Sequence, residues 1–140
     1  MINVEVTIEA SPGVVWSVLT DVERWPEWTH SVTEVTRLDH GDFSVGSKAR
    51  IKQPRLPSMV WTVTDLAADR SFEWAAKGFG FHLVAGHQIS DVANGRTMAI
   101  LSVHQRGTFG QLLEALSSRS ARRHVQMEAA GLKARAESIG

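Results

Sequence analysis

The sequence predicts one α+β domain, in which a curved, seven-stranded antiparallel sheet is covered by a long C-terminal helix lying over a cavity. Three observations predict it. Apolar and polar residues alternate over residues 2–8, as in a half-buried strand. Further alternating segments follow every eight to twelve residues, as in an antiparallel meander. Residues 109–138 then change to helical three- and four-residue spacings without proline.

Two short helices are expected between the first and second strands. Ser11 is a good N-cap and Pro12 suits the first helical position, so a helix should begin there and end near residues 20–21. A second short helix or turn over residues 21–30 carries Trp25 and Trp28. Pro26 is expected to stop regular helix just before it.

The other six strands are expected between residues 31 and 106, with turn signals between them. They cover residues 31–38, 45–53, 58–66, 71–77, 81–90 and 96–106. The apolar face of seven strands is larger than their hairpins can cover, so the long helix is expected to cap it. Twisted antiparallel strands should curve around that helix.

The turn at Asn94-Gly95 predicts a hairpin. Its expected register pairs His87 with Ala99, Ala85 with Leu101 and Leu83 with Val103. A one-residue shift at 78–80 would place Phe72 and Trp74 on the same apolar face.

Composition excludes several classes of function. The 140 residues contain 15 Lys plus Arg and 15 Asp plus Glu, so the formal net charge is zero and nucleic acid is not an expected partner. No stretch approaches the ~20 apolar residues of a membrane span, so no membrane insertion is expected. The N-terminus shows no signal-peptide pattern, and the expected location is cytoplasmic.

No metal and no cofactor are expected. Cysteine is absent, which excludes disulfides and thiolate chemistry, and the six histidines form no zinc-binding pattern. Gly78-Phe79-Gly80 lacks the following helix that a phosphate-binding loop requires. Tyrosine is also absent, which removes it as an acid or base.

Large aromatic side chains on the predicted inner face either fill the interior or line a cavity. Trp61, Phe72 and Trp74 lie at alternating strand positions there. Trp25 and Trp28 either plug the core or lie near a pocket mouth. The ligand-binding candidates are Trp28, Trp61, Phe72, Trp74, His87, Leu101, Leu116 and Met127.

Two histidines are the catalytic candidates. His87 interrupts an apolar strand face, where it could bind a ligand carbonyl or act as an acid or base, or simply be satisfied by a backbone carbonyl or water. His124 lies near Met127 on the long helix. Both would reach a ligand if that helix caps the cavity, or His124 lies on the exposed side with Arg122 and Arg123.

Several local strings resemble those of the START-related superfamily, which includes polyketide cyclases, lipid-transfer domains and the birch-pollen-allergen fold. They run in order over nearly the whole chain: Ser11-Pro12 with Val15-Trp16, Arg24-Trp25-Pro26-Glu27-Trp28, Trp61-Thr62-Val63-Thr64, Phe72-Glu73-Trp74 and Gly131-Leu132-Lys133-Ala134. The resemblance implies the helix-grip fold. It does not specify a reaction, because members include aromatase/cyclases, lipid and quinone carriers and hormone receptors.

The leading hypothesis is that the domain binds a hydrophobic small molecule, such as a lipid, isoprenoid, quinone or polyketide. One alternative is a cofactor-independent cyclase or dehydratase that uses His87 or His124 to move protons. The other is a protein-interaction or stress-related module, and a homodimer is compatible with the sequence. Residue patterns alone leave open whether any reaction is catalysed.

Overall fold

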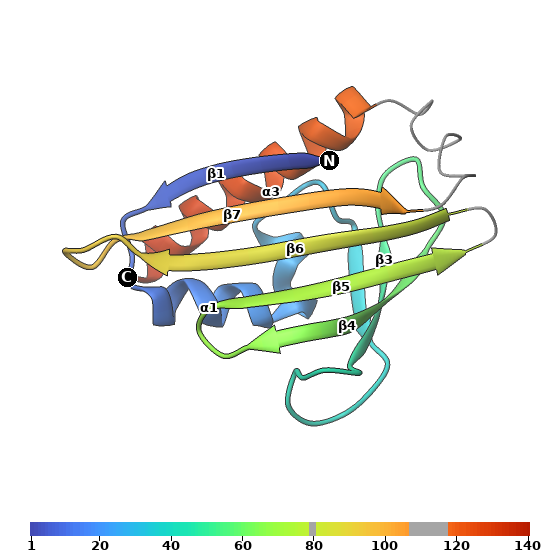
Figure 1. Ribbon diagram of the computed structural model, residues 1–140, viewed down its shortest axis with the longest axis horizontal. Helices are drawn as coiled ribbons and strands as arrows, with labels where there is room; N and C mark the ends of the chain where they lie inside the picture. Colours follow the sequence, from blue (N-terminus) through green and yellow to red (C-terminus); the bar gives the residue numbers. More distant parts are fainter. Residues whose placement is uncertain (79–80, 107–117) are drawn as a thin grey trace.

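The computed structural model describes residues 1–78, 81–106 and 118–140. Its seven strands form one antiparallel sheet in the order β1-β7-β6-β5-β4-β3-β2 (Figure 1). Their bounds are β1 Ile2–Ile8, β2 Glu34–Arg37, β3 Lys48–Lys52, β4 Met59–Ala67, β5 Ser71–Gly78, β6 Phe81–Asp91 and β7 Thr97–Arg106. All seven predicted strands are therefore confirmed, with ends that differ by a few residues.

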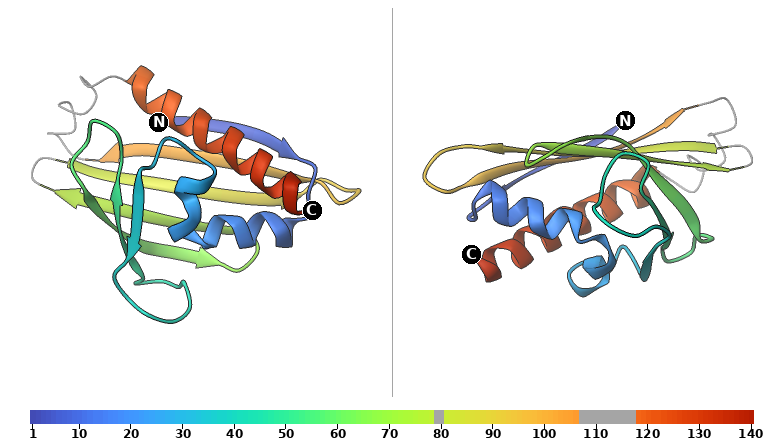
Figure 2. Two further views of the ribbon diagram at one scale, coloured as in Figure 1. Left: turned by 180° about the vertical axis from the view of Figure 1, so that it is seen from behind. Right: turned by 90° about the horizontal axis from the view of Figure 1, so that it is seen from below.

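The helices lie in a second layer on one face of the sheet, as Figure 2 shows. They are α1 (Pro12–Thr20), the 3₁₀ helix η1 (Val22–Glu27) and α3 (Ser118–Ile139). The predicted α+β helix-grip fold is confirmed. Residues 109–117 of the predicted long helix lie outside the described residues. No helix in the described ranges is both long and apolar enough to cross a membrane.

The connection from β1 to β2 crosses the inner face of the sheet, because these two strands form its opposite edges. Ser11 begins α1 by accepting a hydrogen bond at Oγ from the backbone N–H of Val14, 3.4 Å away, as the capping pattern predicts. The end predicted for the next helix was wrong. Pro26 lies inside η1, where a short 3₁₀ helix tolerates the missing N–H.

The inner face carries the predicted aromatic residues. Phe72 pairs with His87, and His87 pairs with Leu101, so these three side chains form one row across β5, β6 and β7. Trp74 lies in the next row, paired with Ala85. The expectation that Phe72 and Trp74 share a face with His87 is confirmed.

The register predicted for the β6–β7 hairpin was wrong by two residues. The five residues 92–96 join the strands, and the middle three, Ala93, Asn94 and Gly95, have positive φ. Glycine adopts a positive φ without steric cost, which suits Gly95 to this turn. A shift of two residues leaves each side chain on its predicted face, so the inner surface is unaffected.

The buried stripe of α3 differs from the one that the sequence suggested. Val125, Ala129, Leu132 and Ala136 are almost fully buried against the sheet and α1. Met127 follows Val125 by two residues, about 200° around the helix, and does not belong to the buried core. The helix therefore presents aliphatic side chains to the interior, and Met127, partly buried, lies on another side of the helix.

Gly131 permits a close approach between α3 and the segment after η1. An added Cβ at this position would overlap the backbone carbonyl of Trp28. Nearby, Arg135 Nη2 lies 2.7 Å from Glu27 Oε1, which ties the same two segments together. The glycine therefore sets the distance at which Trp28 lies beside the helix.

Side chains of α3 also cover the end of the β1 edge strand. Lys133 Nζ donates to the Thr7 carbonyl at 3.0 Å, and the backbone N–H of Glu9 donates to Glu137 Oε2 at 2.8 Å. Lys133 and Glu137 form an ion pair of 2.6 Å. The Lys133 ammonium and the Glu9 N–H together hold the pKa of Glu137 below its ordinary value.

We predict that Gly131→Ala destabilises the protein. Alanine normally improves a helix by about 1 kcal/mol relative to glycine, but overlap with the Trp28 carbonyl should cost about 1–3 kcal/mol overall. Chemical denaturation measures the change. Ala134→Gly, at an exposed site on the same helix, is the control and should lose about 1 kcal/mol through propensity alone. A Gly131→Ala protein more stable than the wild type would contradict the close approach.

We also predict that Glu137→Gln lowers Tm at neutral pH. The folded-state pKa of Glu137 is depressed, so its contribution is present above the unfolded-state pKa and is lost as pH falls through the folded-state value. The Tm difference from wild type should therefore disappear in acid. Glu5→Gln, on the exposed face of β1, controls for removal of a surface charge. A difference independent of pH would exclude the carboxylate as its cause.

Candidate functional site

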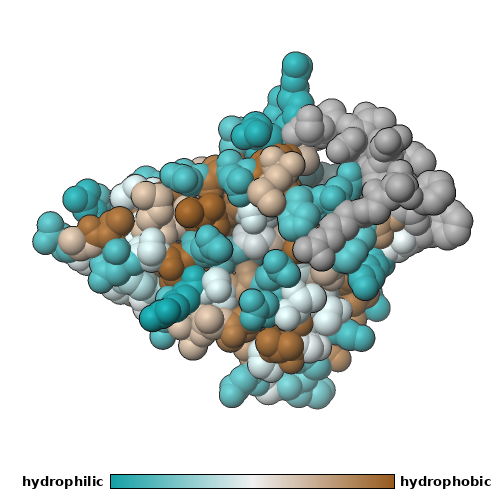
Figure 3. Space-filling view, viewed as in Figure 1, coloured by the Kyte–Doolittle hydropathy of each residue, from teal (hydrophilic) through white to brown (hydrophobic). Residues whose placement is uncertain are grey.

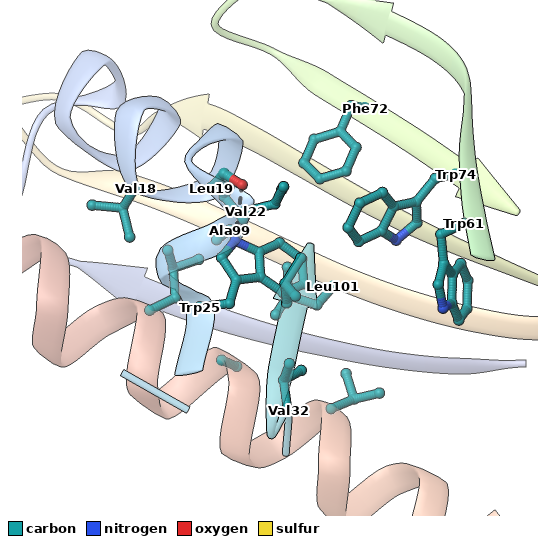
Figure 4. Packing of buried hydrophobic residues seen from close by; sticks show 14 of the residues in the cluster. Val18, Leu19, Val22, Trp25, Val32, Trp61, Phe72, Trp74, Ala99 and Leu101 are labelled. Atoms are coloured by element: carbon teal, nitrogen blue, oxygen red, sulfur yellow. Dashed lines mark hydrogen bonds between the residues drawn. The ribbon is translucent and has the colours of Figure 1, made fainter. Parts of the chain in front are cut away.

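A cluster of aromatic rings occupies the interior between the sheet and the helices (Figure 4). Trp74 is at its centre, with ring centroids 5.3 Å from Phe72, 5.3 Å from Trp25 and 5.8 Å from Trp61. Phe43, from the β2–β3 connection, packs edge-on against Phe72 at 5.1 Å. We call these five residues the aromatic cluster. It joins strands β4 and β5 to η1 and the β2–β3 loop.

His87 lies against this cluster and is only 3% exposed. Its ring stacks on Phe72 with centroids 4.1 Å apart. Nδ1 lies 3.3 Å from the backbone carbonyl of Phe72. A carbonyl only accepts hydrogen bonds, so this contact assigns a proton to Nδ1 and, in the neutral ring, leaves a lone pair on Nε2.

Glu128 of α3 faces that second nitrogen. Its Oε1 lies 3.5 Å from His87 Nε2 and is buried, and it has no hydrogen bond within residues 1–78, 81–106 and 118–140. Glu128 Oε1 can accept a hydrogen bond, and His87 Nε2 accepts one when the ring is neutral and donates one when it is protonated. The pair is therefore able to exchange a proton with a molecule beside it.

His124 lies one turn before Glu128 and is half-buried. Burial lowers the pKa of His124, the charges of Arg123 and Arg55 lower it further, and Glu128 acts in the opposite direction. The ring is therefore neutral at neutral pH. In the described ranges, no three His, Asp or Glu side chains gather as metal ligands.

The inner face is less covered toward the end of the sheet where β6 begins and β7 ends. Leu83, Ala85 and Val103 point inward there, yet all three are only partly buried, as are Phe81 and Gln105. Leu101 and Ala99, farther along β7, are 1% and 0% exposed. We call the less covered part the open end of the inner face.

A hollow of about 240 Å³ lies elsewhere, beside Arg70, Ser71, Gln88, Ile89, Ser90 and Ile100. Most of these side chains belong to the outer face, away from His87. Figure 3, which views that face, shows hydrophilic and hydrophobic residues interspersed over it. The exposed large apolar residues, among them Leu38, Val60 and Val92, lie on different elements, and a homodimer stays a prediction.

The structure brings most of the predicted ligand-binding residues together. Trp61, Phe72, Trp74, His87 and Leu101 line up on neighbouring strands. The rings of Trp61, Phe72 and Trp74 pack against one another, so this part of the interior is filled. Trp28 joins them through Trp25, at 5.5 Å.

Two of the predicted ligand-binding residues are not placed with the others. Leu116 lies outside the described residues, and Met127 is not brought to the aromatic cluster.

Sequence reasoning missed Glu128 and Phe43. Glu128 did carry a signal, because it follows Val125 by three residues and precedes Leu132 by four, the spacing of a buried stripe. Phe43 lies in a connection without periodicity, where the sequence gives no indication of burial.

A family model described as polyketide cyclase/dehydrase and lipid transport matches residues 1–137. The chain belongs to this family. The START-related resemblance seen in the sequence is thereby confirmed, and no curated protein matches the chain.

Solved structures share the fold of this family member. The Zhui aromatase/cyclase from Streptomyces sp. R1128 is 19% identical over 97% of this chain and 92% of that one, with a TM-score of 0.75. A START superfamily protein from Mycobacterium smegmatis is 17% identical over 99% and 98%, with a TM-score of 0.73.

The di-domain aromatase/cyclase of the steffimycin biosynthetic pathway is 10% identical, with a TM-score of 0.74. Alignment covers 99% of this chain but 45% of that one, so this chain corresponds to about half of it. Identities this low establish a common fold and leave the chemistry to be argued from the site itself.

Proposed function

We propose that this protein binds a hydrophobic small molecule between the open end of the inner face and α3. The observation that supports the proposal most directly is the incomplete burial of Leu83, Ala85 and Val103, which face inward beside an otherwise closed aromatic cluster. Apolar side chains on an inner face are normally covered, and ligand sites combine apolar walls with a few polar points. Glu128 and His87 supply such points.

Family membership supports the same proposal, because its description includes both polyketide processing and lipid transport. A lipid, isoprenoid, quinone or polyketide would each offer the apolar body that this surface requires. The His87–Glu128 pair favours a ligand that carries a hydroxyl or carbonyl group near that body.

We predict that N-phenyl-1-naphthylamine, which fluoresces more strongly in apolar surroundings, binds with saturable one-to-one stoichiometry. Ala85→Leu extends a side chain into the proposed site and should weaken binding about tenfold or more. Gln88→Leu introduces the same leucine on the exposed face of β6 with little change in side-chain volume, and it is the control for added apolar surface. Fluorescence titration measures all three proteins.

Absence of saturable binding to the wild type would refute the proposal. Equal affinity in Ala85→Leu and the wild type would place the probe elsewhere, and equal weakening in Gln88→Leu would point to the outer hollow instead.

Acid–base catalysis is a second candidate function, favoured by the 3.5 Å approach of His87 Nε2 to Glu128 Oε1 in the interior. Cyclisation and dehydration require proton transfer and positioning more than a cofactor. The buried pair would take a proton from, or deliver one to, a carbonyl compound held at the open end. His124, neutral and one turn away, is placed to assist.

We predict that the wild type accelerates base-catalysed ring opening of 5-nitrobenzisoxazole, a probe of general bases in apolar sites, by about tenfold or more over Glu128→Gln. His87→Gln should lose the same activity. His30→Gln, which changes an exposed histidine, should keep it. Absorbance of the released phenolate gives the rates. Equal rates in wild type and both folded site variants would refute catalysis by the pair.

A further inference from the structure

The indole nitrogen of Trp61 is a buried donor without an acceptor. Trp61 lies on the inner face of β4 and is 6% exposed. Its Nε1 is buried and has no hydrogen-bond partner among the residues that the structure describes. Unpartnered buried donors are uncommon in folded proteins, because desolvation of the group is then uncompensated.

The rest of the interior shows that this protein can satisfy a buried indole. Trp25 is 3% exposed, and its Nε1 donates to the Leu19 carbonyl at 3.0 Å. Trp25 and Trp61 both pack against Trp74. The unpaired nitrogen of Trp61 is therefore a local property of its site.

The residues that flank Trp61 in the adjoining strands are small. Its partners in the adjoining strands are Ala49 of β3 and Ala76 of β5. The same row continues to Leu83 and Gln105, two of the partly buried residues of the open end. Figure 4 shows the Trp61 ring extending from the sheet into the interior beside Trp74. The unpaired donor thus borders the surface proposed to hold a ligand.

The chemistry of the surroundings limits what would accept this hydrogen bond. Ala49, Ala76 and Trp74 are apolar, and an anion placed among them would lose its hydration without a compensating charge. A neutral carbonyl or ether oxygen would accept the bond without that penalty.

We propose that Trp61 is a specificity-determining residue, whose indole N–H donates a hydrogen bond to a neutral oxygen on the apolar ligand. This inference rests on the proposed binding function and adds a preference for oxygenated molecules over hydrocarbons. The aromatic ring of Trp61 packs against its neighbours, and its N–H favours ligands that carry an oxygen. Phenylalanine at this position should keep the packing and lose the preference for oxygenated ligands.

The test uses 1-tetralone and tetralin, which share a carbon skeleton and differ by one carbonyl, as competitors of N-phenyl-1-naphthylamine. The ratio of their dissociation constants is measured in the wild type and in Trp61→Phe, so that their different solubilities cancel. We expect the preference for 1-tetralone over tetralin to fall about tenfold in Trp61→Phe, because one buried hydrogen bond is lost. Trp16→Phe, which removes an indole from α1, should leave the ratio unchanged.

A second readout uses the unaltered chain. The indole ¹H–¹⁵N resonance of Trp61, assigned through its disappearance in Trp61→Phe, should move downfield with 1-tetralone and much less with tetralin. If the ratio of the two dissociation constants is the same in the wild type and Trp61→Phe, or if the Trp61 resonance does not move, the role of Trp61 is refuted. The binding proposal would still stand in that case. Failure of both compounds to compete with a bound probe, or of the probe to bind, would overturn the binding proposal with it.

Discussion

The pairing of β1 with β7 is the constraint on which the whole interior depends. It places β1 and β2 at opposite edges of the sheet, so the intervening chain must cross the inner face. That crossing, made by α1 and η1, brings Trp25 within 5.6 Å of His87 and 5.3 Å of Trp74. What remains of the inner face is available to α3, which buries Val125, Ala129, Leu132 and Ala136, and Gly131 permits its close approach to Trp28. The layout of helices and site thus follows from one strand pairing.

Polar atoms held without partners distinguish this interior from an ordinary core. An unsatisfied buried donor or acceptor costs about 1–3 kcal/mol, against a total stability of about 5–15 kcal/mol for a domain. In the described part of the chain, Trp61 Nε1 is in this position, and Glu128 Oε1 has no hydrogen bond and only its 3.5 Å contact with His87 Nε2. Phenylalanine and an apolar aliphatic residue would fill comparable volumes without that cost. The retained polarity is most simply understood as serving a molecule that enters the interior.

The two proposed functions, ligand carrier and acid–base catalyst, differ in whether a proton is transferred to or from the bound molecule. Both require an apolar surface and polar points that orient the ligand, and members of one fold family use the same framework for either purpose. His87 is held rigidly, stacked on Phe72 and bonded to its carbonyl, so its second nitrogen has a fixed direction. Whether the bound molecule exchanges a proton with that nitrogen and Glu128, or only donates a hydrogen bond, separates the two functions.

The sequence by itself determined the order of elements, the faces of the strands and the family, because alternation of apolar residues, capping and turn chemistry are local properties. It therefore located Trp61, Phe72, Trp74 and His87 on one surface. Only the tertiary structure decided which face of α3 is buried, since the rotation of a helix depends on contacts such as Gly131 against Trp28. That rotation turns Met127 away and brings Glu128 to His87, a meeting of residues from distant segments that no local pattern encodes.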